Sequence, residues 1–395
     1  MTNLVVVLGS PVQPLLTMKI LHYNLTTTTK AGGVETFVWE LGGALARRGH
    51  AVTLLGGAPP RGVQAPQATE PLVQVERVPF LDRTLFQRLP PLRRMYAIVK
   101  LLERASMIPP ALPLLLRKHY DIVHMHKPYD LLLAPWFAAR GTKVVLHSHG
   151  EDFFPSDKLL VRATSAILSC SAFNANYTHQ RYQRPVTVVY NGFDAERFRP
   201  QPPDRALRDQ LLPRNHVVLL VVARLQPWKG VQDLVAAMAL LHNQPVTLLV
   251  IGDGIYREVL EHQIRAAGLE TQVRLLGAVA YQAMPRYYAL ADLVLGASYA
   301  SETFGMALCE AMGCGKAVVA SDFGGFPEVV EDGVTGLLVP PRDPKAFAQA
   351  IGSLLYDPAR RAAFGAAGRA RALRLFTWDA VTDRVEAVYR DVLGK

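Results

Sequence analysis

The sequence has few cysteines and none of the spacings by which cysteine and histidine hold structural metals. Only Cys170, Cys309 and Cys314 occur among the 395 residues, and each lies in an apolar stretch. Three cysteines placed in this way provide neither a disulfide framework nor a zinc-ligand pattern. They fit a reducing compartment, so we expect a cytoplasmic protein.

Long hydrophobic runs are also missing. No apolar run approaches the roughly 20 residues that cross a bilayer, so we expect no transmembrane helix. Residues 1–17 are apolar but contain no Lys or Arg, and they therefore lack the basic start of a signal peptide. A second start-like stretch, MKILHYN, begins at Met18 and predicts the first strand. We interpret residues 1–17 as an extension outside the fold, and an additional edge strand formed by LVVVL is the alternative.

The glycine-rich fingerprints of nucleoside triphosphate and dinucleotide sites do not occur at the start of the fold. The first predicted strand is followed by TTTTKAGGVETF, which matches neither the P-loop nor GxGxxG. Gly32 and Gly33 nevertheless open a long predicted helix, where backbone amides can approach a phosphate closely. We expect these two glycines to lie against a phosphate group.

Positive charge is concentrated in one segment. Of the formal net charge of +10, residues 83–118 carry +7, with eight basic residues against Glu103 alone. Apolar residues interleave with the charges, which suits an anionic membrane surface or an anionic acceptor; a solvated helical face is the alternative. The sequence has no recognition-helix, zinc-finger or aromatic stacking pattern, so we expect no nucleic-acid partner.

Short apolar strands alternate with helical patterns along the chain. In the first half, the predicted strands are KILHY, AVTLL, DIVHMH, KVVLHS, SAILSC and VTVVYN, and GVETFVWELGGALARRGH has the spacing of a helix. A second alternation begins with HVVLLVVARL and ends in helical patterns over residues 343–374 and after a capping Thr377. Apolar strands separated by helices predict parallel sheets covered on both faces. We therefore expect an α/β fold of two tandem Rossmann-like, doubly wound domains.

Composition indicates where these domains meet. Residues 191–213 are rich in proline and charge, and we interpret them as the interdomain connection. We predict one domain over residues 18–195, a second over residues 196–376, and a terminal helix over residues 377–395 that crosses back to the first domain. Two such domains face across a cleft between the carboxyl edges of their sheets, where ligands of parallel sheets bind.

Two glutamates stand eight positions apart in SETFGMALCEAMGCG. Phe304 and Gly305 lie where a helix should begin, so Glu302 precedes the first turn and Glu310 lies inside the helix. Amides at a helix start attract polar ligand oxygens, and a carboxylate can accept hydrogen bonds from two vicinal hydroxyls. We expect Glu302 to hold a sugar ring and Glu310 a ribose. The alternative, one acid favoured by the helix dipole and one on a solvent face, explains Glu302 but not Glu310, whose neighbours are apolar.

Cations follow a buried strand of the second half. Arg224 and Lys229 lie in ARLQPWKG, directly after HVVLLVV and hence in the cleft. Two cations there can neutralise a diphosphate, although surface charges on a loop are the alternative. Gly252, in IGDG after the next strand, would let a ligand approach the backbone.

Histidines end two strands of the first half. His147 and His149 lie in VVLHSHGED, and His124 and His126 lie in DIVHMH. Such histidines can donate to a sugar oxygen or serve as an acid or base. Four histidines on neighbouring strands could also hold a metal, but no fixed ligand spacing supports this. We therefore expect no metal site.

Together these motifs resemble those of a known family. The segments are GGVE, HSHGED, YNGFDAERFRP, ARLQPWKG, IGDG, ADLVLGAS, ETFGMALCEAMGCGKAVVASDFGGFPEVVEDGVTGLLV and TWDAV. From Met18 onward the chain resembles the retaining, nucleotide-sugar-dependent glycosyltransferases of family 4, which have the GT-B fold. The resemblance implies an N-terminal acceptor-binding domain, a C-terminal nucleotide-sugar-binding domain, and a reaction without a divalent metal or other cofactor.

The resemblance also assigns roles to individual residues. Backbone near Gly277 and Ala278 would contact the base of the donor, and Glu310 would bind its ribose. Glu302, with the backbone of Phe304, Gly305 and Met306, would bind the donor sugar. Gly33 would approach the phosphates. Arg224 and Lys229 would hold the diphosphate, and His149 would reach the transferred sugar.

The implied reaction moves a sugar from a UDP- or GDP-type donor to a saccharide or lipid-linked acceptor by front-face displacement. From the cysteines and from the basic segment 83–118, we expect a cytoplasmic protein with peripheral contact at the inner face of the membrane. Ala297 and Lys316 stand where the family often has proline, so loop rigidity and donor preference can differ. A nucleotide-sugar epimerase or phosphorylase on the same architecture and a non-catalytic nucleotide-sugar-binding module are the alternatives.

Overall fold

The structure is a computed structural model that describes residues 17–394 except 31, 60–70, 89–94 and 151. The chain divides into two compact units, Met1–Val145 and Leu146–Lys395, and the boundary falls inside the strand β5. The predicted N-terminal extension and its alternative edge strand lie outside the described residues, apart from the last position. Within the described ranges, no helix has the length and apolar character needed to cross a membrane.

The first sheet has seven strands in the order β3-β2-β1-β4-β5-β6-β7. They are β1 (Lys19–Tyr23), β2 (Ala51–Gly57), β3 (Gln74–Val78), β4 (Ile122–Met125), β5 (Lys143–Ser148), β6 (Ala166–Ser169) and β7 (Thr187–Val188). β1 pairs in parallel with both β2 and β4. The strand order therefore reverses between β1 and β4, which makes this the ligand-binding position expected for a doubly wound sheet.

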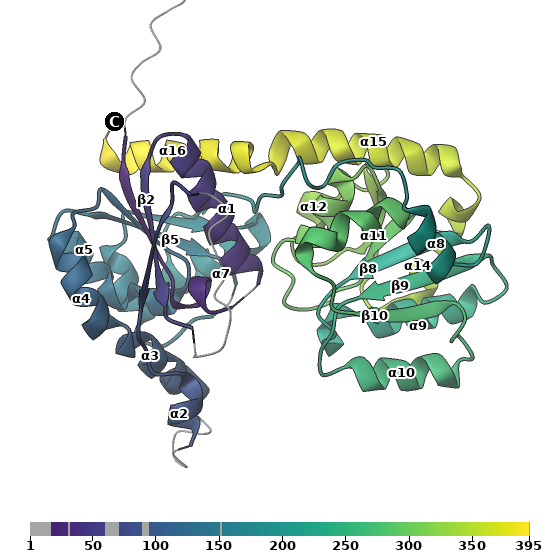
Figure 1. Cartoon of the computed structure of the whole chain (residues 1–395), viewed down its shortest axis with the longest axis horizontal. Coiled ribbons are helices and arrows are strands. Elements are labelled where there is room, and N and C mark those ends of the chain that lie inside the picture. Colours follow the sequence, from purple (N-terminus) through teal and green to yellow (C-terminus); the bar gives the residue numbers. More distant parts are fainter. Residues whose placement is uncertain (1–16, 31, 60–70, 89–94, 151, 395) are drawn as a thin grey trace, which may run out of the picture. The chain divides into compact units, whose positions relative to one another are not determined.

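Helices connect the strands of this sheet. They are α1 (Gly33–Arg47), α2 (Arg83–Gln87), α3 (Tyr96–Ser106), α4 (Ile108–Arg117), α5 (Ala134–Ala139), α6 (Asp157–Leu160) and α7 (Ala172–Tyr182). α1 forms where predicted, because Phe37, Val38, Leu41 and Leu45 recur at helical spacing and are buried. The buried stripe packs α1 against β2, which Figure 1 shows beside it.

Some of the cations in the basic segment, residues 83–118, are buried. α3 turns Lys100, Glu103 and Arg104 into the interior, and Arg104 Nη1 lies 2.8 Å from Asp130 Oδ1. A buried carboxylate needs a cationic or hydrogen-bonding partner, and Arg104 supplies it. Lys100 and Arg104 are therefore largely withdrawn from the surface of the segment.

α3 directs large apolar side chains outward instead. The exposed apolar residues on and beside this helix are Met95, Tyr96, Ile98 and Leu102. Arg88 and Arg117 are exposed at the two ends of the segment, while Arg93 and Arg94 lie outside the described residues. The surface of the segment thus combines apolar side chains with cations, but the buried Lys100 and Arg104 are not among those cations.

The second sheet has six strands in the order β10-β9-β8-β11-β12-β13. They are β8 (Val217–Val222), β9 (Val246–Ile251), β10 (Val273–Gly277), β11 (Leu293–Gly296), β12 (Ala317–Ser321) and β13 (Gly336–Val339). Leu219 and Val221 of β8 enter one apolar core, and Val218 and Leu220 enter another on the opposite face. The prediction of parallel sheets covered on both faces is confirmed.

The remaining helices follow the last strand of the first sheet, and several of them form the two cores of the second sheet. They are α8 (Arg205–Leu211), α9 (Val231–Leu240), α10 (Arg257–Ala266), α11 (Met284–Leu290), α12 (Met306–Gly313), α13 (Phe326–Val329), α14 (Pro344–Leu355), α15 (Pro358–Leu375) and α16 (Trp378–Leu393). α9, α10 and α14 contribute to one core, and α11, α12 and α13 to the other (Figure 1). The Thr377 hydroxyl accepts from the amide of Ala380, which confirms the predicted cap of the last helix.

Candidate functional site

Three predicted residues lie on two neighbouring loops at the carboxyl edge of the second sheet. β8 and β11 are neighbours at its centre, and the strand order reverses between them. The loop after β8 carries Arg224 and Lys229, and the loop after β11 carries Glu302. The two loops touch, because the amide of Tyr299 donates to the carbonyl oxygen of Trp228 at 2.9 Å. The fold thus places these residues where ligands of doubly wound sheets bind.

The loop of Glu302 leads directly into α12. Gly305 precedes this helix at φ +110°, a left-handed conformation that glycine adopts without strain. A Cβ at this position would also collide with the ring of Phe326. Phe304 is buried, and Met306 is the first helical residue. The prediction that a helix begins here is confirmed, and the first amides of α12 lie next to the loop.

Lys229 and Glu302 form an ion pair that the sequence does not predict. Lys229 Nζ lies 2.7 Å from Glu302 Oε2, and the two side chains are 15% and 14% exposed. The Ser298 hydroxyl donates to the same carboxylate oxygen at 3.0 Å. Arg224 is exposed, and it makes no ion pair with any described residue. A cation and a carboxylate held side by side at a helix start can bind a phosphate and a sugar hydroxyl together.

Glu310 lies in the interior of α12 and is 6% exposed. The hydroxyl of Tyr288, on α11, donates to Glu310 Oε2 at 2.8 Å. Burial raises the pKa of Glu310 to about 7, although the hydrogen bond from Tyr288 acts in the opposite direction. The alternative that Glu310 is an acid on a solvent face is therefore wrong. Tyr288 stands 22 residues earlier in an ordinary helical segment, and nothing in the sequence marks it as a partner.

The predicted backbone contacts lie at the ends of the next two strands. Gly252 follows β9 at φ +134°, and a Cβ there would collide with the carbonyl oxygen of Ala223. Its amide donates to the carbonyl oxygen of Gly277, at the end of β10, at 2.8 Å. Ala278 follows and is exposed. These residues continue the carboxyl edge outward from β8.

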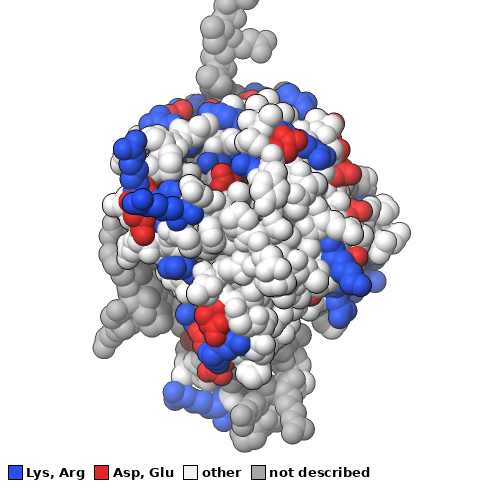
Figure 2. All heavy atoms as spheres, turned by 90° about the vertical axis from the view of Figure 1, so that its right-hand side faces the viewer, with Lys and Arg blue, Asp and Glu red and all other residues white. Residues whose placement is uncertain are grey.

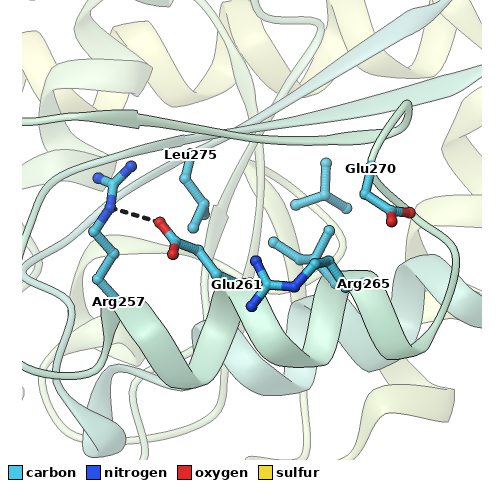
Figure 3. A pocket seen from close by; sticks show the side chains of 7 residues that line it. Arg257, Glu261, Arg265, Glu270 and Leu275 are labelled. Atoms are coloured by element: carbon cyan, nitrogen blue, oxygen red, sulfur yellow. Dashed lines mark hydrogen bonds and ion pairs between the residues drawn. The ribbon is translucent and has the colours of Figure 1, made fainter.

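A cavity of about 230 Å³ lies between α10 and the edge strand β10. It is lined by Arg257, Glu261, Ile264, Arg265, Glu270, Val273 and Leu275. Figure 3 shows Arg257 and Glu261 on one helix, with Arg257 Nε 2.8 Å from Glu261 Oε1. The predicted site residues do not line this cavity. Because its cations lie among carboxylates, it is poorly suited to bind a diphosphate.

The predicted residues of the first sheet follow β1 and β5. His149 comes after β5 and is half-buried, and within the second unit its carbonyl oxygen accepts from the Thr303 hydroxyl at 3.1 Å. Gly32 precedes α1 and Gly33 begins it, and both are exposed. Glu151 of the same motif lies outside the described residues. His149 is therefore tied through its backbone to the loop before α12.

The histidines of DIVHMH belong to a buried cluster of the first unit. His124 and His126 stack with centroids 4.4 Å apart, and the ring of His22 lies 5.2 Å from each. Burial lowers the pKa of His22 to about 3, so its ring is uncharged at neutral pH. Sequence reasoning did not connect His22 with this group, because it stands 104 residues before His126.

The two departures from the family pattern have local structural consequences. Lys316 donates its backbone amide to the carbonyl oxygen of Ala311 at 3.0 Å, a hydrogen bond that proline could not make. Its ammonium donates to the carbonyl oxygen of Ala289 at 3.1 Å. Ala297 is buried, and its carbonyl oxygen lies against Gly230. The two hydrogen bonds of Lys316 thus connect the turn after α12 to α12 and to α11.

Charged side chains of both signs are dispersed over the face drawn in Figure 2. Figure 2 shows a face of the molecule on which Lys and Arg side chains stand around a broad area without charged residues, with Asp and Glu among them. Nucleic-acid affinity depends on neutralising a row of phosphates. The described residues of this face offer no such row.

Family models and relatives define the class of this protein. The model described as Glycosyltransferase Family 4 matches residues 31–197, and the model described as Glycosyl transferases group 1 matches residues 204–371. A GDP-mannose-dependent alpha-(1-6)-phosphatidylinositol monomannoside mannosyltransferase of Mycolicibacterium smegmatis is 31% identical over 267 residues, which cover 62% of this chain and 70% of the relative. A D-inositol 3-phosphate glycosyltransferase of Thermobifida fusca is 30% identical over 406 residues, which cover 93% of this chain and 90% of the relative.

Solved structures of glycosyltransferases are also similar to this chain. The crystal structure of Anabaena HepE in complex with UDP is similar at a TM-score of 0.77 and 26% identity, covering 95% of this chain and all of that one. The complex of the same protein with UDP-glucose gives a TM-score of 0.73 over the same shares. The two family models together match most of the chain and show that it is a glycosyltransferase. The chain belongs to glycosyltransferase family 4 and has the GT-B fold.

Proposed function

We propose that this protein is a retaining glycosyltransferase that moves a sugar from a UDP- or GDP-type donor to a saccharide or lipid-linked acceptor. The observation that carries the proposal is the ion pair of Lys229 with Glu302 beside the start of α12, at the reversal of strand order. The names of relatives support both donor classes, since one relative is called GDP-mannose-dependent and another was solved with UDP-glucose.

In the proposed mechanism, positively charged groups of the protein face the negative charge of the leaving diphosphate. As the bond between sugar and diphosphate breaks, negative charge develops on the leaving oxygen, and Arg224, Lys229 and the first amides of α12 stabilise it. Glu302 accepts hydrogen bonds from sugar hydroxyls, and His149 donates to the transferred sugar. The leaving phosphate takes the proton of the acceptor hydroxyl, which attacks on the same face of the sugar. With an α-linked donor the product is therefore α-linked, and a β-linked product in its NMR spectrum would contradict this mechanism.

The donor experiment is a thermal-shift panel of UDP, GDP and ADP with the full chain. A nucleoside diphosphate at one hundred times its Kd stabilises the folded state by about 2.7 kcal/mol. We expect one base to raise the Tm clearly more than the others. If none of the three changes the Tm, the proposed donor site has no ligand and the proposal fails.

Two variants distinguish a catalytic transferase from a protein that only binds the nucleotide sugar. Glu302→Gln and His149→Asn should lower sugar transfer from a labelled donor by at least about 100-fold, while the affinity for the nucleoside diphosphate changes little. Unchanged turnover in both variants would assign the chemistry to other residues. Absence of transfer and of donor hydrolysis in the wild type, with binding intact, would favour a non-catalytic binding module.

We propose further that the reaction needs no divalent metal. The support is the pair of cations, Arg224 and Lys229, at the position where a metal would otherwise neutralise the diphosphate. Protein freed of metals by a chelator should show the same rate of transfer with and without added Mg²⁺ or Mn²⁺. A rate that rises with either ion would overturn this part of the proposal.

A peripheral contact with an anionic membrane through residues 83–118 is also proposed, for a cytoplasmic protein. Its support is the exposed apolar side of α3 between the exposed cations Arg88 and Arg117. Cosedimentation with vesicles rich in phosphatidylserine should weaken in Ile98→Glu, but not in the control Val259→Glu on α10. Equal binding of both variants, or no binding of the wild type, would contradict the contact.

A further inference from the structure

Three histidine side chains of the first unit project from the same face of the sheet. β1 and β4 pair in parallel, and their register sets His22 directly opposite His124. His126 follows two residues later, and side chains on one face of a strand recur every second residue. The three residues stand where the strand order reverses between β1 and β4.

The ring nitrogens of these residues converge. One nitrogen from each ring can be chosen so that all three lie within 4.8 Å of one another. His22 Nδ1 lies 3.0 Å from His126 Nε2. In a tetrahedral zinc site with Zn–N bonds of about 2.0–2.1 Å, neighbouring nitrogens stand roughly 3.3 Å apart. The pair of His22 with His126 is thus slightly closer than in such a site, and the whole set lies within 4.8 Å.

The surroundings of the cluster favour a ligand. His22, His124 and His126 are 1%, 0% and 0% exposed. His22 Nδ1 and His126 Nε2 share a hydrogen bond that an ion would replace, and the other nitrogen of the His22 ring, Nε2, has no hydrogen-bond partner among the described residues. Three imidazoles suit zinc and other late transition metals, whereas Mg²⁺ and Ca²⁺ prefer oxygen ligands.

We propose that His22, His124 and His126 form a buried site for Zn²⁺ or a similar transition metal. The ion links β1 to β4 at the carboxyl edge of the first sheet, and three histidine ligands leave a fourth position for water. The three residues of the site are different from those to which the donor is assigned above, Arg224, Lys229, Glu302 and Glu310. The site is independent of the proposed transfer reaction, since a diphosphate held by Arg224 and Lys229 needs no zinc.

The first test uses the full chain after removal of metals. Titration with Co²⁺ should give one equivalent with the visible absorption of a four-coordinate site. Thiolate-to-cobalt charge transfer should be absent, because the ligands are imidazoles. Zn²⁺ should displace Co²⁺, and it should raise the Tm of the metal-free protein, since it binds only the folded state. No visible band and no change of Tm would overturn the proposal.

Variants locate the ion. His124→Gln and His22→Gln should each weaken Zn²⁺ binding at least about tenfold, whereas His119→Gln, an exposed histidine of the same unit, should not. If a core variant does not fold, X-ray absorption of the zinc-loaded wild type decides, because it reports the ligand atoms directly. Nitrogen and oxygen ligands alone support the site, whereas a sulfur ligand, or equal affinity in all three folded variants, contradicts it.

Discussion

A carboxylate inside an apolar helix is the residue on which the donor site depends most. Glu310 accepts from Tyr288 and is almost fully buried, and its pKa is raised to about 7 by burial. Its ionised form can accept two ribose hydroxyls, whereas its protonated form competes with them as a donor. If the nucleotide binds only the ionised form, Glu310 must lose its proton before binding. The affinity of the protein for the nucleotide should therefore fall as the pH drops below 7.

The same pKa predicts how stability depends on pH. The folded state holds the proton of Glu310 more tightly than the unfolded chain, whose pKa stays near the ordinary 4.5. The contribution of this group is therefore complete below pH 4.5 and is lost as the pH rises to about 7, a loss of up to about 3 kcal/mol. Urea unfolding of the wild type and Glu310→Gln at pH 5, 6, 7 and 8 measures it. A difference between the two proteins that does not change with pH would contradict the raised pKa.

The pair of Lys229 with Glu302 predicts a specific loss of phosphate affinity. Lys229→Ala should weaken binding of the nucleoside diphosphate roughly 10- to 100-fold, because a charge-assisted hydrogen bond is removed. Binding of the corresponding nucleoside should change little. Titration calorimetry with both ligands measures the ratio, and Lys345→Ala, an exposed lysine on α14, is the control. Equal losses for nucleoside and diphosphate would remove Lys229 from the phosphate site.

The position of a site residue could be predicted from the sequence where a single motif contained both the residue and the helix start that places it. Glu302 and Glu310 share a motif with their helix start, so their placement was predictable. The pairing of Lys229 with Glu302 was not, because it joins loops 73 residues apart. His22 escaped notice for the same reason: its partners stand on another strand, and only the register of β1 with β4 brings them together.

At the scale of elements, the start of α12 depends on one glycine. Gly305→Ala places a Cβ at a positive φ and against Phe326, so it should destabilise the fold by roughly 1–3 kcal/mol. Gly352→Ala is the matched control. It lies within α14 with open space around its Cα, and alanine there should stabilise the helix by about 0.5–1 kcal/mol. Urea unfolding gives both values, and shifts of the same sign would contradict the account of Gly305.

α3 depends in the same way on its buried ion pair. Arg104→Met leaves Asp130 without its cation and should cost about 3–5 kcal/mol. Changing Asp130→Leu as well should restore much of that loss, because the uncompensated charge is gone. Arg257→Ala, which breaks a surface pair with Glu261, should cost no more than about 1 kcal/mol. Chemical unfolding distinguishes these cases, and a double variant as unstable as the single one would contradict the argument.

Elements with a clear apolar period were predictable, and elements without one were not. Each predicted strand is present, but VTVVYN forms only the short β7. β3 was missed, because QVERV is an edge strand with charged residues and little apolar pattern. The helical stretch over residues 343–374 proves to be two helices, since the chain turns at Tyr356 and Asp357 before Pro358 begins α15.

At the scale of the whole molecule, the α/β class and the two parallel sheets followed from the alternation of strands and helices. The strand orders did not, because nothing in a single sequence states which strands are neighbours. The predicted domain boundaries at residues 195 and 376 remain predictions. The strand orders explain the site, since each sheet reverses beside its first strand and each reversal gathers polar side chains that are far apart in sequence.

The most direct measurement of the donor site is a calorimetric cycle on ribose recognition. The nucleoside diphosphate selected by the thermal-shift panel and its 2′-deoxy analogue are each titrated into the wild type and Glu310→Gln. We predict that loss of the 2′-hydroxyl weakens binding roughly 10- to 100-fold in the wild type and far less in the variant, because Glu310 receives that hydroxyl. Equal affinity of the wild type for both ligands, or an undiminished preference in the variant, would contradict the assignment of Glu310 and with it the proposed orientation of the donor.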